Sequence, residues 1–104
     1  MNNLKYVTTF YNGNDYRTID IKRIDEKCYV SLHYSEVTNE WTITDLFVED
    51  FYNNQALAKE LIDCTKHHTK YISINLTDNT SQWLIDFFRL NKIRIKLQIN
   101  FDYE

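Results

Sequence analysis

Three side chains capable of chemistry lie close together in the segment Cys64 to His68. The thiol of Cys64 and the imidazoles of His67 and His68 stand at spacings that one helical turn brings together. A metal site is one interpretation, and a thiol nucleophile with a histidine base is another. The competing interpretation is that histidines near a helix C-terminus interact favourably with the helix dipole. We favour this last one, because no further ligand and no orienting third group accompany them.

Three carboxylates, Asp45, Glu49 and Asp50, lie within or directly after the apolar segment from Trp41 to Val48. One of them could act as a general base at the end of a strand. The alternative is that they are solvated loop charges that favour the start of the next helix. We favour loop charges.

A basic stripe near the C-terminus is made of Lys92, Arg94 and Lys96, which alternate with apolar residues, and Arg89 precedes it. Such a stripe guards an edge strand against aggregation in many proteins. It is equally typical of a surface that binds an anionic partner or the acidic face of another protein. Both interpretations stay open at this point.

The composition describes one small domain, residues 1–104, in which 43% of the residues are apolar. A chain of this size buries enough surface to fold without a metal or a disulfide. The formal net charge is −3 and the cationic residues are scattered, so direct nucleic-acid binding is not expected. The start of the chain lacks an apolar signal segment and no apolar run approaches a membrane span, so we expect a cytoplasmic protein. Cys28 and Cys64 are therefore expected to be free thiols.

Alternation of apolar and polar residues predicts six strands. The expected strands are 4–10, 16–24, 28–34, 41–48, 71–76 and 93–101. Asn12-Gly13 predicts a hairpin between the first two. In the fourth, Trp41 and Ile43 are apolar at odd positions whereas Leu46 and Val48 are apolar at even ones, so we predict a β-bulge near Thr44-Asp45.

Apolar residues at helical spacing predict two helices. The first covers 54–68, with Asn53 or Asn54 as its cap, and the second runs to Asn91 after a capping box of Asn79 and Gln82. A helix between the fourth and fifth strands predicts a right-handed parallel crossover. The expected fold class is α+β, with a mixed, mostly antiparallel sheet and two helices in the order β-β-β-β-α-β-α-β.

The segment from about Trp41 to Ile93 resembles the GCN5-related N-acetyltransferase (GNAT) family. A bulged strand ends in Leu46-Phe47-Val48, and a short polar loop leads into a helix that begins Tyr52-Asn53-Asn54-Gln55-Ala56-Leu57-Ala58. The family carries Arg/Gln-x-x-Gly-x-Gly/Ala in this loop. Ile72-Ser73-Ile74-Asn75-Leu76 is similar to the next strand of the family, and Asn79 stands where its characteristic Asn opens the following helix.

The resemblance implies a coenzyme A site, because free backbone N–H groups at a helix N-terminus hold a pyrophosphate. The residues that it assigns to the cofactor are Phe47, Val48, Asn53, Asn54, Gln55, Ala56, Leu57, Ala58, Asn79 and Phe88. The chain departs from the family at three of them. Asn53 replaces Arg or Gln, Ala56 replaces the first Gly, and Phe88 occupies the position of the Tyr that protonates the leaving thiolate.

These departures suggest a scaffold that has lost its catalytic groups. The family's helices between its first two strands are also absent, because Asn12-Gly13 joins the strands directly. We therefore expect a small protein-binding inhibitor or modulator that needs no cofactor, of the kind that phages and mobile elements encode, including anti-CRISPR proteins. The expected partner is another protein, bound through Arg89, Lys92, Arg94 and Lys96. The alternative is an acetyl-CoA-dependent N-acetyltransferase that acts on a protein or another macromolecular amine.

Overall fold

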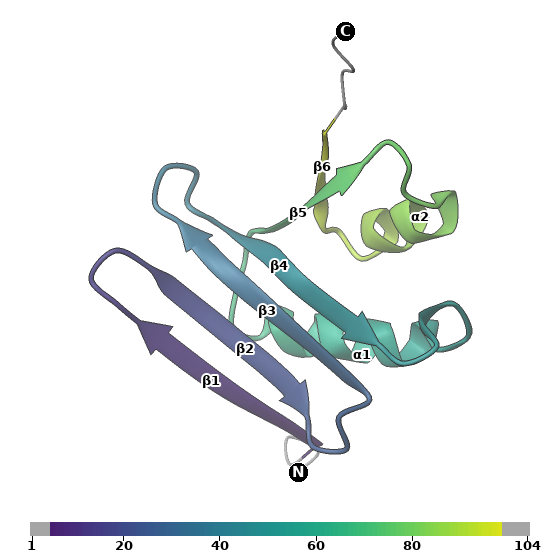
Figure 1. The fold of residues 1–104 in the computed structure, drawn as a ribbon, viewed down its shortest axis with the longest axis horizontal. Helices are drawn as coiled ribbons and strands as arrows, with labels where there is room; N and C mark the ends of the chain where they lie inside the picture. Colours follow the sequence, from purple (N-terminus) through teal and green to yellow (C-terminus); the bar gives the residue numbers. More distant parts are fainter. Residues whose placement is uncertain (1–4, 99–104) are drawn as a thin grey trace, which may run out of the picture.

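The computed structural model describes residues 5–98 and has the predicted order of strands and helices (Figure 1). The strands are β1 (Tyr6–Asn12), β2 (Arg17–Arg23), β3 (Cys28–Ser35), β4 (Glu40–Val48), β5 (Ile72–Thr77) and β6 (Arg94–Gln98). The helices are α1 (Gln55–Lys66) and α2 (Gln82–Leu90), and a short 3₁₀ helix, η2 (Phe51–Asn53), precedes α1. The α+β class is confirmed. Positions 4 and 99–101 of the predicted strands lie outside the described residues.

All six strands form one sheet in the order β1-β2-β3-β4-β5-β6. The first four strands make an antiparallel meander, whereas β4 pairs with β5, and β5 with β6, in parallel. Each parallel step needs a crossover connection, which α1 and α2 supply. The prediction of a mixed sheet is therefore confirmed.

The register aligns one apolar residue from every strand in a row across the sheet. This row is Phe10, Ile19, Leu32, Ile43, Ile74 and Ile95. The adjacent row, which points to the opposite face, consists mostly of polar residues and includes Thr18, His33, Thr42, Ser73 and Arg94. Alternate residues of a strand face opposite sides, so the apolar row lies on one face of the sheet and the polar row on the other.

Both helices contribute to the core, which contains the members of this row in β2 to β5 and packs against Ile95, whereas Phe10 is 55% exposed. The buried residues of α1 are Ala58, Leu61, Ile62 and Thr65, and those of α2 are Ile85, Phe87 and Phe88. The Lys66 ammonium donates a hydrogen bond to the Asn91 carbonyl, which joins the ends of the two helices. In the described part of the chain, neither helix is long and apolar enough to cross a membrane.

The predicted bulge lies at Thr44. Asp45 is opposite Ser31 and Ile43 is opposite Leu32, so Thr44 is an extra residue in β4 without a partner in β3. The bulge restores the parity of β4, because Ile43 and Val48 are both buried despite their odd and even positions. Beyond it β4 leaves β5, since the two strands pair only at Trp41–Ile43 with Ile72–Ile74.

The hairpin predicted at Asn12-Gly13 is confirmed, because β1 and β2 pair antiparallel and the Gly13 N–H donates to the Tyr16 carbonyl at 2.8 Å. Two predictions about helix caps need correction. Asn54 is the N-cap of α1, but its side chain makes no capping bond. The N-cap of α2 is Ser81 and not Asn79, and Gln82 donates to Asp86 instead of closing a capping box.

Candidate functional site

The loop before α1, where the resemblance places coenzyme A, uses its polar side chains internally. The Asn53 amide donates to both oxygens of Asp50, at 3.1 and 3.2 Å. The Asn54 amide donates to the Glu49 carbonyl at 2.6 Å, and the Gln55 amide donates to the Tyr52 carbonyl at 3.0 Å. An arriving phosphate would have to compete with these bonds, and it would meet the carboxylate of Asp50 within the same loop.

The other residues assigned to coenzyme A lie in different environments. Val48, Ala58 and Phe88 belong to the buried core, and Leu57 packs against it. Phe47 stacks on Tyr29 of the neighbouring strand, with ring centroids 5.5 Å apart. Ala56 and Asn79 are exposed. Three of the ten assigned side chains are therefore occupied in packing the core.

An aromatic cluster connects the segment after β4 with α2. The Phe51 ring meets the rings of Trp83 and Phe87 edge-on, with both centroid distances at 5.3 Å, and Tyr52 meets Trp83 at 5.2 Å. These segments leave the sheet from β4 and β5, the two strands that diverge after the bulge. These aromatic rings therefore join the segment that follows β4 to the helix that follows β5.

The basic stripe forms part of a hollow of about 360 Å³ at the starts of β4, β5 and β6, which we name the cationic hollow. Three cationic side chains line it: Lys70, Lys92 and Arg94. The one carboxylate in its lining is Glu40, and the remaining lining residues are Thr38, Asn39, Tyr71 and Ile72. Lys96 lies next to it on β6, whereas Arg89 is exposed in the last turn of α2.

Glu40 is the buried carboxylate of the cationic hollow. Its side chain is only 7% exposed, and it pairs with Lys96 and, at 3.4 Å, with Arg94, whose side chain is 70% exposed. The hydrogen bond from Lys96 holds the pKa of Glu40 below its ordinary value, and Arg94 acts in the same direction. The bond joins Arg94 to Glu40, which lies 54 positions earlier in the sequence, and it holds Arg94 at the rim of the cationic hollow.

Lys92 and Arg94, which the sequence predicted to bind a partner, line this hollow. Lys70 and Glu40 line it as well, and the sequence analysis did not single them out. Lys70 stands in the turn between α1 and β5, and Glu40 opens β4. Only the parallel pairing of β4, β5 and β6 brings these segments together. The signal for Glu40 in the sequence is its place directly before the apolar strand residues. A carboxylate that is buried with such a strand requires a cationic partner.

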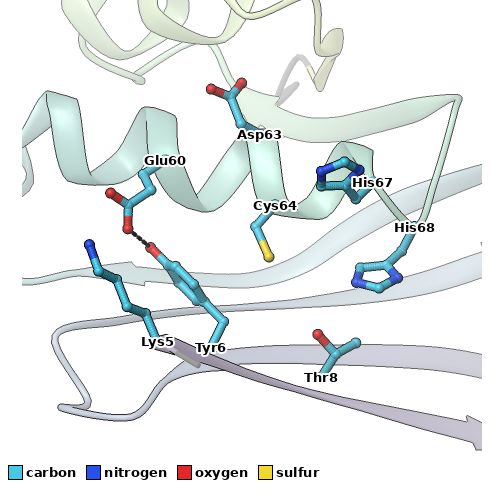
Figure 2. A pocket seen from close by; sticks show the side chains of 8 residues that line it. All are labelled: Lys5, Tyr6, Thr8, Glu60, Asp63, Cys64, His67 and His68. Atoms are coloured by element: carbon cyan, nitrogen blue, oxygen red, sulfur yellow. Dashed lines mark hydrogen bonds between the residues drawn. The ribbon is translucent and has the colours of Figure 1, made fainter. Parts of the chain in front are cut away.

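A second hollow, of about 680 Å³, separates β1 from α1 (Figure 2). We name it the β1–α1 groove. Tyr6 and Thr8 line it from the strand, and Cys64, His67 and His68 line it from the end of the helix. Lys5, Glu60 and Asp63 complete the lining. The predicted cluster Cys64-His67-His68 therefore does share one hollow, although within residues 5–98 no group of three or more His, Cys, Asp or Glu is arranged to hold a metal ion.

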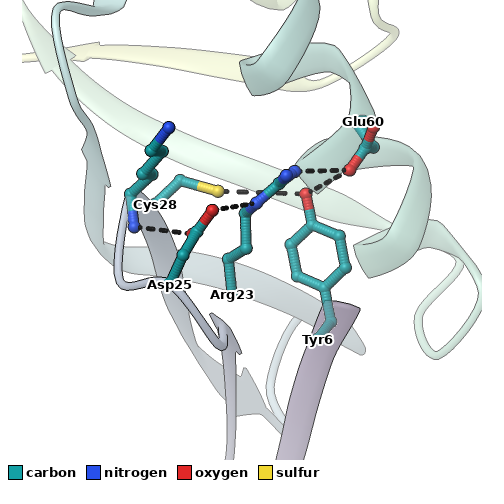
Figure 3. Close-up of polar contacts among 6 residues, drawn as sticks. Tyr6, Arg23, Asp25, Cys28 and Glu60 are labelled. Atoms are coloured by element: carbon teal, nitrogen blue, oxygen red, sulfur yellow. Dashed lines mark hydrogen bonds and ion pairs between the residues drawn. The ribbon is translucent and has the colours of Figure 1, made fainter. Parts of the chain in front are cut away.

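A polar network closes one end of the β1–α1 groove (Figure 3). Tyr6 donates its hydroxyl proton to Glu60 at 2.9 Å, and Arg23 donates to the same carboxylate at 3.0 Å. Arg23 also donates to Asp25 at 2.9 Å. Burial and the bond to Glu60 raise the pKa of Tyr6 well above its ordinary value, so its phenol stays protonated. The network ties β1 and β2 to α1.

The three carboxylates considered above as general bases are exposed: Asp45, Glu49 and Asp50. Asp50 has a left-handed backbone, with φ of 48°, and its carboxylate accepts the bonds from Asn53. Asp45 is a strand residue opposite Ser31. The exposure of all three side chains is that of solvated charges.

Comparisons with protein families, with curated proteins and with solved structures find no match to this chain.

We predict that Glu40 makes the protein sensitive to acid. Because the pKa of Glu40 is lower in the folded state, its stabilisation is complete above its ordinary value of 4.5 and is lost as the pH falls through the folded-state pKa. Glu40→Gln should lower the free energy of unfolding at pH 7 by roughly 1 to 3 kcal/mol and flatten its dependence on pH below about 5. Urea titrations between pH 3 and 7 measure this. The control Glu36→Gln, at an exposed position nearby, should change neither, and equal acid sensitivity of wild type and Glu40→Gln would contradict the assignment.

We predict that the two thiols differ in reactivity. Both are free, Cys28 is fully buried, and burial raises the pKa of each thiol. Cys64 should react with a disulfide reagent more slowly than a free cysteine does, and faster as the pH rises. In a Cys64→Ser variant, Cys28 should react only as fast as the protein unfolds. Rapid labelling of that variant in native buffer would show that the core around Cys28 is open.

Proposed function

We propose that this protein acts by binding another protein and modulating or inhibiting it, and that the partner presents an acidic surface to the cationic hollow. The observation that carries this proposal is the convergence of Lys70, Lys92 and Arg94 on one hollow whose lining contains a single carboxylate. Excess positive charge on one patch of an otherwise negative protein attracts an acidic partner and speeds its association.

The alternative explanation of the basic stripe is that it guards β6 as an edge strand. That explanation accounts for Arg94 and Lys96, which are residues of β6. It does not account for Lys70, which lies in the turn before β5, or for Lys92, which has a left-handed backbone with φ of 59° before β6 begins. Charges contributed by three segments to one hollow favour a binding role.

Ion pairing separates the cations into two groups. Lys96 and Arg94 pair with Glu40, so they contribute to the fold. Lys70 and Lys92 form no ion pair within residues 5–98, so their charges are available to a partner. A short chain with this surface and with altered catalytic positions fits the kind of inhibitor that phages and mobile elements encode, including anti-CRISPR proteins.

We predict that Lys70→Glu with Lys92→Glu slows association with the partner by at least tenfold at low salt and leaves the melting temperature within about 2 °C. The partner is first captured from a bacterial lysate by the wild-type protein and identified, and its association is then measured by surface plasmon resonance. The matched control Lys22→Glu with Lys27→Glu makes the same change in net charge elsewhere and should bind as the wild type does. Equal association rates for both double variants would refute the role of the cationic hollow.

A second candidate function, acetyl transfer from acetyl-CoA to a macromolecular amine, is favoured by one observation. The bulge at Thr44 and the divergence of β4 from β5 are the features that would let a pantetheine arm lie between two parallel strands. The aromatic cluster around Phe51 and the internally bonded loop side chains weigh against it. Phe88 is only 1% exposed and cannot protonate a thiolate.

We predict that isothermal titration calorimetry detects no acetyl-CoA binding tighter than about 1 mM. Asn53→Arg with Ala56→Gly should bring binding into the measurable range, because the first change supplies a cationic partner and the second opens the backbone to a phosphate. Asn53→Arg with Gln55→Gly is the control, since it adds the same charge and one glycine but leaves Ala56. Micromolar binding by the unmodified protein, together with acetyl transfer to any amine, would establish the enzyme instead.

A further inference from the structure

Strand β1 is the outermost described strand on its side of the sheet, and half of its backbone groups have no partner in the described chain. The Ile24 N–H donates to the Lys5 carbonyl and the Gly13 N–H donates to the Tyr16 carbonyl, both at 2.8 Å. Antiparallel strands exchange hydrogen bonds at every second residue pair, so the odd-numbered residues of β1 bond to β2. The N–H and C=O groups of Tyr6, Thr8 and Phe10 consequently point away from β2.

This edge lacks the features by which proteins protect an edge strand. The residues Tyr6–Asn12 include no charged residue and no proline, and their pairing with β2 has no bulge. The opposite edge, β6, carries Arg94 and Lys96. A long uncharged edge strand is a template for pairing with another strand, so natural proteins usually cover it.

The β1–α1 groove makes this edge accessible from the helix side. Tyr6, Thr8 and Phe10 point their side chains toward α1, because Tyr6 bonds to Glu60, Thr8 lines the groove and Phe10 meets the His68 ring at 5.5 Å. Val7 and Tyr11 point to the other face and are about half exposed. A strand beside β1 would therefore find room for side chains on both faces of the sheet.

We infer that β1 pairs with β1 of a second copy of this chain, antiparallel, about a two-fold axis at Thr8. In this register Tyr6 lies opposite Phe10 of the other copy and Val7 lies opposite its Thr9, so aromatic and β-branched residues form the cross-strand pairs. Lys5, the nearest charged residue, lies opposite Tyr11, so no like charges meet. A two-fold axis uses the same surface twice and closes the assembly at two copies.

The placement of Glu60 along the β1–α1 groove also agrees with this arrangement. Glu60 lies beside Tyr6 at one end of the groove, and His68 lies beside Phe10 at the other. Because the axis places Tyr6 of one copy opposite Phe10 of its partner, the Glu60 end of each groove faces the end of the other groove that carries His67 and His68. The two Glu60 carboxylates are therefore kept apart across the axis, so the register that pairs the aromatic residues also avoids a contact between like charges.

The test is the mass of the wild-type protein by analytical ultracentrifugation from about 1 µM to 1 mM. We expect a monomer–dimer equilibrium. Thr8→Lys should weaken it at least tenfold, because it puts two ammonium groups opposite each other at the axis. The control Thr9→Lys adds the same charge to the next residue, whose side chain faces the other side of the sheet, and should dimerise nearly as well. A wild-type protein that stays monomeric to 1 mM would overturn the inference and leave the edge to a strand from a different protein.

A covalent test fixes the register and does not depend on the folding of Thr8→Lys. Residues that face each other as a hydrogen-bonded antiparallel pair have Cα atoms about 5.5 Å apart, which is within reach of a disulfide. Thr8→Cys in a Cys64→Ser background should form a covalent dimer under mild oxidation, whereas Thr9→Cys in the same background should not. Equal cross-linking of the two variants would reject the axis at Thr8. This outcome is independent of the cationic hollow, which lies on other strands.

Discussion

The structure depends on one constraint, which is that strands β2 to β5 must present their buried apolar side chains to the same face of the sheet. Two helices can cover only that face, so a strand whose apolar residues changed sides would expose half of them. Strand β4 has this problem, because Ile43 and Val48 stand at positions of opposite parity, and the extra residue Thr44 solves it. The divergence of β4 from β5 follows directly after the same bulge. A feature that resembles a cofactor cleft is therefore also a requirement of packing.

Both of the surfaces that we propose for binding lie at an end or an edge of the sheet. At one end, buried Glu40 pairs with Lys96 and Arg94, and the turns bring Lys70 and Lys92 beside them. A buried carboxylate is tolerated there because two cations neutralise it. At the first edge, β1 keeps its outward backbone groups unpaired within residues 5–98. The polar side chains of the loop before α1, by contrast, bond within the loop.

Local patterns predicted most of the fold, and long-range contacts explain what was missed. Period-two alternation located the strands, helical spacing located α1 and α2, and the change of parity located the bulge. The caps were wrong or incomplete because several Asn and Ser residues compete for such positions, and the final choice depends on backbone geometry. The proximity of Lys70 to Lys92, and of Tyr6 to Glu60, depends on strand pairing and helix packing, which no short segment encodes. The Cys64-His67-His68 cluster was found, but the groove around it was not.

The most direct test of the account is amide hydrogen exchange along β1, resolved by residue with NMR at low and at high protein concentration. In dilute solution the amides of Val7, Thr9 and Tyr11 should be protected by β2, while those of Tyr6, Thr8 and Phe10 exchange rapidly. At a concentration where the second copy binds, Tyr6, Thr8 and Phe10 should become protected as well. Rapid exchange of these three amides at every concentration, or equal protection of all six in the dilute monomer, would contradict the account.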